Sequence, residues 1–243
     1  MNSRNVTKYI DIRTCGDRLS YMAAGRTYDD GCAAAHALDL VGERWALLVV
    51  RELLLGPKRF TDLRTGLPNA SPNVLAQRLR GLEAAGIVRR GELPPPAASK
   101  IYELTEWGRD LEPVIIALGK WGVRSPSKPP DAELGVDSLI LSFRTMFDPE
   151  RAAGFDATYE FRLGEHRFRA EVAEGRLEIE RGTAEAPDAT VEAEAGTLAA
   201  LVYDDLELDD ALSCGDLRIE GSKEAVERFL MLFPLPEPAA VGA

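Results

Sequence analysis

Hydrophobic residues recur at helical spacing through the first half of the chain. Three short segments are predicted to be helices, at 35–41, 44–55 and 61–67. A fourth helix is predicted from Ser71, a good N-cap followed by a proline in the first helical position, to Gly86. Two strands, at 87–93 and 100–104, are predicted around a proline-rich loop at 94–99. Helices followed by a two-stranded ribbon are typical of a winged helix-turn-helix domain.

The helix predicted between Ser71 and Gly86 has one apolar face and one polar face. At about 100° per residue, leucines share one face and longer polar side chains the other: Leu75, Leu79 and Leu82 against Asn73, Gln77 and Arg80. Asparagine and glutamine pair with adenine edges and arginine with guanine edges, so the polar face suits the major groove of DNA. A solvated surface helix has the same pattern. The basic residues of the predicted ribbon favour DNA binding over this simpler interpretation.

A further amphipathic helix is predicted after the ribbon, and a proline-rich boundary follows it. The apolar positions of this helix are Leu111, Val114, Ile115, Leu118 and Trp121. This stripe either joins the domain core or packs against a second copy of the chain. Pro113 lies too far from the predicted start at Thr105 to be a first-turn residue, so we expect it to bend the helix. Three prolines among the polar residues at 125–130 predict an extended linker.

Beyond the linker, one more helix precedes a change to the period of strands. Apolar residues from Val136 to Phe147 recur at helical spacing. The pattern then alternates at 159–163, 168–172 and 177–179, which predicts an antiparallel meander with one dry face. The remaining predicted elements are a strand at 189–193, helices at 197–203 and 209–213, a strand at 217–219 and a helix at 222–233. Strands with their helices grouped on one face form an α+β layer.

Length and charge are consistent with two domains of an α+β protein. The chain has 243 residues, and residues 1–125 carry 18 basic against 14 acidic side chains, whereas residues 126–243 carry 11 against 26. Only the first half suits a polyanion, so we expect the acidic half to face away from DNA. The predicted parts are an N-terminal extension (1–27), a winged helix-turn-helix domain (28–124), a linker (125–135) and a C-terminal α+β domain with an antiparallel sheet (136–236).

Several short motifs of the first half occur in the order in which a known family has them. They run from Cys32 to about Trp121 and include ALDLVGERW at 37–45, RFTDL at 59–63, SPNVL at 71–75 and YELTEWG at 102–108. In these motifs the chain resembles the HxlR-type bacterial transcription regulators. The resemblance implies a homodimer, formed by the outer helices, that represses or activates transcription. It also implies that the helix after Ser71 recognises DNA and that the ribbon is the wing.

This resemblance and the basic ribbon give the predicted DNA-contacting residues. They are Ser71, Asn73, Gln77, Arg78 and Arg80 on the helix, Arg59 before it, and Arg89, Arg90 and Lys100 on the ribbon. The helix is expected to read bases, and the ribbon is expected to meet flanking phosphates. Two such helices would enter successive major grooves about 34 Å apart on a pseudo-palindromic site.

The second half resembles the sterol-carrier-protein-like lipid-binding fold, from about Asp137 to Pro234. The resemblance rests on the strand at 188–193, the helix beginning at Thr197 and the sequence ALSCGDLRIEGS at 211–222. That family often has a basic residue where Asp216 stands, so no ligand preference is carried over. A hydrophobic effector is predicted to contact apolar residues of this domain, unless they only fill a core. These residues are Phe161, Phe168, Leu177, Leu198, Leu201, Val202, Phe229 and Phe233.

Other candidate chemistry is limited to one thiol. The cysteines Cys15, Cys32 and Cys214 and the two histidines lack metal-site spacing, and no catalytic or cofactor-binding motif occurs. We therefore predict no enzyme activity, cofactor or metal. Cys32 is either a small packing residue or a redox sensor, because some members of the resembled family sense oxidants or electrophiles through a cysteine near this place. With no recognisable signal peptide or membrane span, we predict a cytoplasmic protein.

The sequence thus predicts a homodimeric transcription regulator controlled by a hydrophobic effector in its C-terminal domain. The expected partners are double-stranded DNA, a second copy of the chain and a small hydrophobic ligand, with no membrane. One alternative is a lipid-binding or carrier protein whose winged-helix half serves dimerisation or protein contacts. A second alternative is a thiol-based regulator that uses Cys32.

Overall fold

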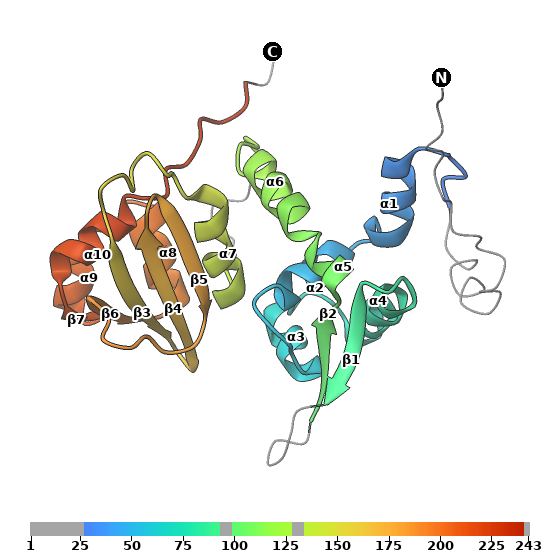
Figure 1. Cartoon of the computed structure of the whole chain (residues 1–243), viewed down its shortest axis with the longest axis horizontal. Coiled ribbons are helices and arrows are strands. Elements are labelled where there is room, and N and C mark those ends of the chain that lie inside the picture. Colours follow the sequence, from blue (N-terminus) through green and yellow to red (C-terminus); the bar gives the residue numbers. More distant parts are fainter. Residues whose placement is uncertain (1–26, 93–98, 128–133, 241–243) are drawn as a thin grey trace, which may run out of the picture.

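Two domains, each with its own hydrophobic core, make up the computed structural model (Figure 1). The structure describes residues 27–92, 99–127 and 134–240. Nearly all of the predicted N-terminal extension, much of the linker and most of the loop between the ribbon strands lie outside these ranges. Within them, every helix is too short or too polar to span a bilayer.

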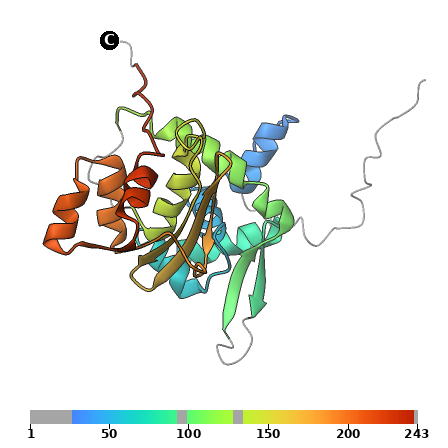
Figure 2. The same ribbon diagram turned by 60° about the vertical axis from the view of Figure 1, so that its left-hand side comes forward.

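The N-terminal domain confirms the predicted order of helices and ribbon. Its elements are α1 (Ala33–Val41), α2 (Ala46–Leu53), α3 (Phe60–Gly66), α4 (Pro72–Ala84), β1 (Val88–Glu92), β2 (Lys100–Leu104), α5 (Glu106–Arg109) and α6 (Glu112–Gly122). Strands β1 and β2 pair antiparallel, with Val88 opposite Leu104. The ribbon projects from the body of the domain (Figure 2).

The single bent helix predicted after the ribbon is wrong, because the chain forms two helices there. Thr105 caps the short α5 with its Oγ1, which accepts a hydrogen bond from the N–H of Gly108 (3.0 Å). The chain then turns before α6, so Pro113 lies in the first turn of α6. In that position its missing N–H removes no intrahelical hydrogen bond and no bend is needed.

The C-terminal domain places helices against one five-stranded sheet. Its elements are α7 (Val136–Met146), β3 (Ala157–Leu163), β4 (His166–Ala173), β5 (Arg176–Arg181), β6 (Ala189–Ala193), α8 (Ala195–Tyr203), α9 (Leu208–Cys214), β7 (Leu217–Gly221) and α10 (Lys223–Leu230). The order of strands is β5-β4-β3-β6-β7. Phe143 of α7 and Phe229 of α10 both contact Phe161 of β3, with ring centroids 6.4 and 4.9 Å apart, so α7 and α10 cover the same face of the sheet.

The prediction of a wholly antiparallel sheet is wrong for one pair of strands, because β6 runs parallel to β3. Between β5 and β6 the chain crosses the outer face of the sheet, where the N–H of Ala184 donates to the carboxylate of Glu160 (3.0 Å). This crossover brings β6 to the far side of β3 in the same direction. It also explains why Glu160 is buried on a face that is otherwise polar.

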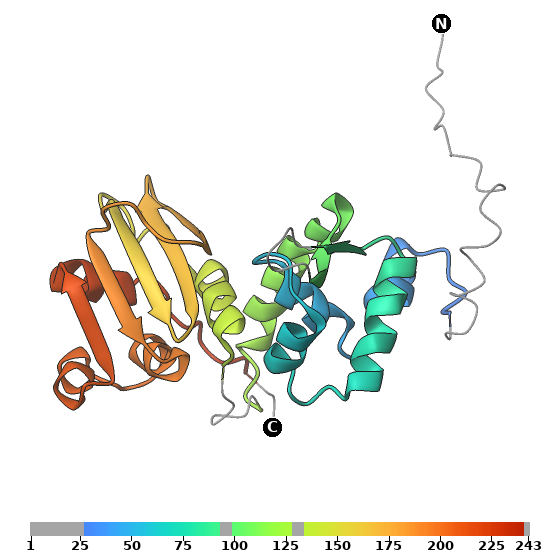
Figure 3. The ribbon, with the colours of Figure 1, turned by 90° about the horizontal axis from the view of Figure 1, so that it is seen from below.

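The two domains meet at α6 and α7, which lie side by side between them (Figure 3). A Cβ atom at Gly119 of α6 would lie 3.2 Å from Cγ2 of Thr145 in α7, so the helices approach closely there. At the other end of α7, Nζ of Lys58 lies 2.6 Å from carboxylate oxygens of both Glu52 in α2 and Asp137 in α7. A cation held between two buried carboxylates therefore joins the two domains.

Candidate nucleic-acid interface

Helix α4 presents the polar face that the sequence predicts. Its N-cap is Ser71, whose Oγ accepts a hydrogen bond from the N–H of Val74 (3.4 Å), and a proline follows in the first turn. The three predicted apolar residues, Leu75, Leu79 and Leu82, are buried in the domain core. The opposite residues, Asn73, Gln77 and Arg80, are exposed. The helix is thus held by one face and has side chains of base-reading type on the other.

Arg78 is directed toward the protein rather than away from it. Its Nε donates to the carbonyl of Arg44 (2.9 Å), and its guanidinium forms an ion pair with Glu43 (2.7 Å). These contacts fasten α4 to the turn between α1 and α2. Arg78 therefore positions the helix, and a contact between Arg78 and DNA stays a prediction.

The ribbon carries three exposed basic residues, one of which contacts α4. Arg89 of β1 forms an ion pair with Glu103 of β2 (2.9 Å). Arg90 pairs with Glu83 of α4 (3.0 Å), and its guanidinium lies 5.8 Å from the ring centre of Tyr102. Lys100 begins β2. Because these ion pairs are solvent-exposed, their exchange for phosphate contacts costs little.

Arg59, which was also predicted to contact DNA, lies on neither α4 nor the ribbon. The acidic partners of the ribbon arginines were not predicted. Arg59 is exposed at the N-cap of α3, where its N–H donates to Asp62 (3.0 Å). Glu103 lies opposite Arg89 in the β1–β2 register. A cross-strand pair of this kind follows from the sequence only once the strand register is known.

The apolar stripe of α6 is divided between the core and the surface. Leu111 and Ile115 pack against the core of the N-terminal domain. Val114, Leu118 and Trp121 remain exposed, Trp121 to 75%. Leu38 of α1 is also half exposed, and α1 and α6 project from the same side of the domain (Figure 1). Large exposed apolar side chains that share one face of a helix, as Val114, Leu118 and Trp121 do on α6, mark an interaction surface.

Most of the predicted effector-binding residues form a packed interior among the described residues. Phe161, Phe168, Leu198, Leu201, Phe229 and Phe233 are buried, whereas Leu177 and Val202 are partly buried. The rings of Phe229 and Phe233 lie 4.9 Å apart, as do those of Phe161 and Phe229. Leu177 instead lines a surface cavity. An effector contact for these residues stays a prediction.

Cys32 is exposed at the N-cap of α1. The backbone N–H groups of Ala35 and Ala34 in the first turn of α1 lower the pKa of its thiol from the ordinary value for cysteine. A lowered pKa increases the fraction of thiolate, which is the reactive form. Cys214 is also exposed, at the last residue of α9, and Cys15 lies outside the described residues.

Known proteins resemble the two halves of the chain separately. The alkyl sulfatase C-terminal family model matches residues 132–239. The resemblance of this half to sterol-carrier proteins is not confirmed by that match and stays a prediction. The HxlR-like helix-turn-helix family model matches residues 40–128.

Individual bacterial regulators are similar in sequence to the N-terminal domain of this chain. The uncharacterised HTH-type transcriptional regulator YvaP of Bacillus subtilis is 39% identical over 85 residues, which are 35% of this chain and 79% of YvaP. The HTH-type transcriptional regulator YodB of the same organism is 40% identical over 85 residues, which are 35% of this chain and 76% of YodB. The solved structure of reduced YodB has 35% sequence identity and a TM-score of 0.36, and covers 40% of this chain and 97% of that one. With these relatives and the winged-helix elements in place, the chain belongs to the HxlR-like helix-turn-helix family of transcriptional regulators.

Proposed function

We propose that this regulator binds DNA as a homodimer under the control of a hydrophobic effector. The observation that carries the DNA-binding geometry is the exposed face of α4, with Asn73, Gln77 and Arg80, beside the exposed arginines Arg89 and Arg90 of the ribbon. In this proposal α4 enters the major groove and the ribbon follows the phosphates. Two copies would place their α4 helices about 34 Å apart on a pseudo-palindromic site.

The exposed apolar residues on α1 and α6 support the second copy as partner. These helices are the outer elements of the winged-helix domain, and they lie on the side away from the ribbon (Figure 1). Burying Val114, Leu118 and Trp121 against the same residues of a partner would form a two-fold interface. Such an interface fixes the distance between the two α4 helices.

The position of the C-terminal domain supports its role as the effector domain. It contacts α2 and α6 of the DNA-binding domain, so a change in its position is transmitted to the helix proposed for dimerisation. This domain matches the alkyl sulfatase C-terminal family model. Because the name of that family refers to alkyl sulfates, the match supports a ligand with an alkyl chain. An effector shifts DNA binding only by its differential affinity for the two arrangements.

The roles of helix and ribbon are tested by a mobility-shift titration with DNA from the promoter of the protein's own gene. Arg80→Ala is expected to weaken specific binding by about 1–3 kcal/mol and to relax sequence preference at one position. Arg89→Ala with Arg90→Ala is expected to weaken binding to all sequences alike and to reduce the salt slope by about two, because two phosphate contacts are lost.

Arg218→Ala is the control for these variants. Arg218 is exposed in the C-terminal domain, so its loss should leave DNA binding unchanged. Equal effects of the three variants would contradict the assigned roles. If wild-type protein gives no shift that resists random competitor DNA, the carrier alternative is favoured.

Leu118→Glu is expected to convert the dimer into a monomer. Leu118 is half exposed in the middle of α6, and a charge buried at the centre of an apolar interface is not compensated. Light scattering after size-exclusion chromatography measures the mass directly. Met231→Glu is the control, because Met231 is more exposed but lies in the C-terminal domain. A dimer that survives Leu118→Glu would place the interface elsewhere.

A thiol-based response is the second candidate function, favoured by the exposed N-cap position of Cys32 and its lowered pKa. The pH midpoint of Cys32 alkylation by iodoacetamide is expected to be lower in the native protein than in urea, since the native thiol ionises at lower pH. Mass spectrometry locates the label. Cys214, which is also exposed but lies at the C-terminal end of a helix, is the comparison. Identical midpoints in the native and unfolded protein would remove this candidate.

A further inference from the structure

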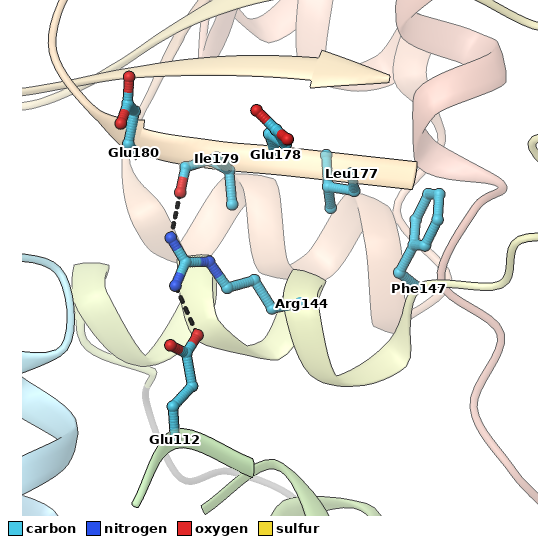
Figure 4. A pocket seen from close by; sticks show the side chains of 7 residues that line it. All are labelled: Glu112, Arg144, Phe147, Leu177, Glu178, Ile179 and Glu180. Carbon is cyan, nitrogen blue, oxygen red and sulfur yellow. Dashed lines mark hydrogen bonds and ion pairs between the residues drawn. The ribbon is translucent and has the colours of Figure 1, made fainter. Parts of the chain in front are cut away.

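An ion pair crosses the boundary between the two domains beside a cavity. Arg144 of α7 donates through Nη1 to Oε1 of Glu112 in the first turn of α6 (2.6 Å), and through Nη2 to the carbonyl of Ile179 on β5 (Figure 4). The side chains of Arg144 and Glu112 are 23% and 32% exposed. The pair is thus accessible to a competing ligand while still partly shielded from water.

The cavity has a volume of about 420 Å³, within the range of small-molecule sites. Arg144, Phe147 and Leu177 line it, together with Glu112 and the β5 residues 178–180. In Figure 4 the side chains of Phe147 and Leu177 face the space beside Arg144, whereas the carboxylates of Glu178 and Glu180 lie on the other side of β5. The cavity therefore combines an apolar wall with one arginine, whose guanidinium is paired with the carboxylate of Glu112.

We propose that this cavity binds an amphipathic monoanion, with its carboxylate or sulfate group on Arg144 and its alkyl chain on Phe147 and Leu177. In the structure described, the carboxylate of Glu112 occupies the position of the ligand's anionic group. A planar guanidinium pairs with either anion by the same charge-assisted hydrogen bonds. The proposal rests on the proposed effector function and adds the class of ligand and its site.

The geometry favours an anion over an organic cation. To bind Glu112, a cation would have to break its ion pair with Arg144. Arg144 would nevertheless stay in the cavity, because its guanidinium is also hydrogen-bonded to the carbonyl of Ile179. The cation would then lie beside another positive charge. An anion replaces one carboxylate by another on the same arginine, and the displaced carboxylate of Glu112, whose side chain is 32% exposed, turns to water.

Exchange at Arg144 provides a direct route from ligand to DNA binding. Glu112 begins α6, the helix that also carries the exposed Leu118 and Trp121. When the ligand takes its place on Arg144, Glu112 loses its ion pair with α7, and α6 loses one of its contacts with the C-terminal domain. The ligand and the Arg144–Glu112 pair are therefore mutually exclusive, which couples ligand binding to the domain arrangement.

Isothermal titration of the full chain with decanoate tests the site. Wild-type protein is expected to bind decanoate but not decyltrimethylammonium. Arg144→Gln should weaken decanoate binding by at least about tenfold, because a charged hydrogen-bonding partner is lost. Glu112→Gln should strengthen it by up to about fivefold, because a half-exposed competing carboxylate is removed. The opposite signs separate loss of the site from loss of folding.

Arg169→Gln is the matched control, because Arg169 pairs with Glu180 (2.7 Å) on the outer face of the same sheet. Its decanoate affinity should equal that of wild type. The proposal is overturned if decanoate does not bind, if Arg144→Gln leaves its affinity unchanged, or if Glu112→Gln weakens it. DNA titrations with and without decanoate decide the effector function separately. Binding at Arg144 without any change in DNA affinity would keep the site and refute the effector function.

Discussion

Replacing Lys58 with methionine is expected to lower the free energy of unfolding by about 3 kcal/mol. Lys58 lies between Glu52 and Asp137, whose side chains are only 2% and 3% exposed. Methionine nearly preserves the volume but removes the charge, so two buried carboxylates lose a common partner. The loss stays near the lower end of the range for buried pairs, because Arg51 still contacts Glu52 and Arg181 still contacts Asp137. Urea unfolding followed by circular dichroism measures it.

Lys223→Met is the matched control for this prediction. Lys223 also lies between two carboxylates, Asp209 at 2.6 Å and Glu227 at 3.3 Å, but its side chain is 45% exposed. Water solvates these charges after the substitution, so no resolvable loss of stability is expected. If both variants unfold at the same urea concentration, burial of the Lys58 group does not govern its energy.

The Lys58 substitution also bears on function, because of where its backbone lies. The N–H and carbonyl of Lys58 pair with the carbonyl and N–H of Tyr102 on β2 (3.0 and 2.8 Å). The same residue thus contacts the root of the ribbon through its backbone and the C-terminal domain through its side chain. The interdomain charge group is therefore tied by backbone hydrogen bonds to β2 of the ribbon.

Local pattern predicted most helices and strands of the described residues, but not the division of the segment after the ribbon into α5 and α6. The N-cap at Ser71 and the leucine spacing of α4 are local signals, and both are confirmed within one or two residues of the predicted bounds. The alternation of apolar residues gave the strands β3 and β4 and their buried face in the same way. These signals are strong because each arises from neighbours along the chain.

What depends on distant parts of the chain was not predicted. Alternation determines which face of β6 is buried but not its direction, so its parallel pairing with β3 was missed. Pro113 was predicted to bend one long helix, whereas it lies in the first turn of a second helix. The break between α5 and α6 depends on the contact of α5 with the ribbon, which is a tertiary contact. The polar face of α4 was predicted residue by residue, yet the pairing of Arg78 with Glu43 was not. The Arg144–Glu112 pair was missed because its partners belong to different domains.

Gly108→Ala is expected to lower the stability of the winged-helix domain by about 1–3 kcal/mol, as overpacking does. A Cβ atom at this buried position would lie 2.2 Å from the carbonyl oxygen of Ile87, a backbone atom that cannot rotate away. The same carbonyl accepts a hydrogen bond from the N–H of Thr105 (3.0 Å). Displacing α5 would therefore loosen the ribbon root, and DNA affinity should fall for all sequences alike. Thermal unfolding and the mobility-shift titration measure the two effects.

Gly81→Ala separates this steric effect from the general effect of adding a methyl group. Gly81 lies inside α4, and nothing would lie within 4 Å of its added Cβ. Alanine is favoured over glycine in a helix interior, so Gly81→Ala should raise stability by about 0.5–1 kcal/mol. Opposite signs for the two glycine substitutions would establish that close packing of α5 on Ile87 holds the ribbon. If Gly108→Ala is as stable as Gly81→Ala, the ribbon root tolerates movement, and its rigidity does not explain how the ribbon is positioned on DNA.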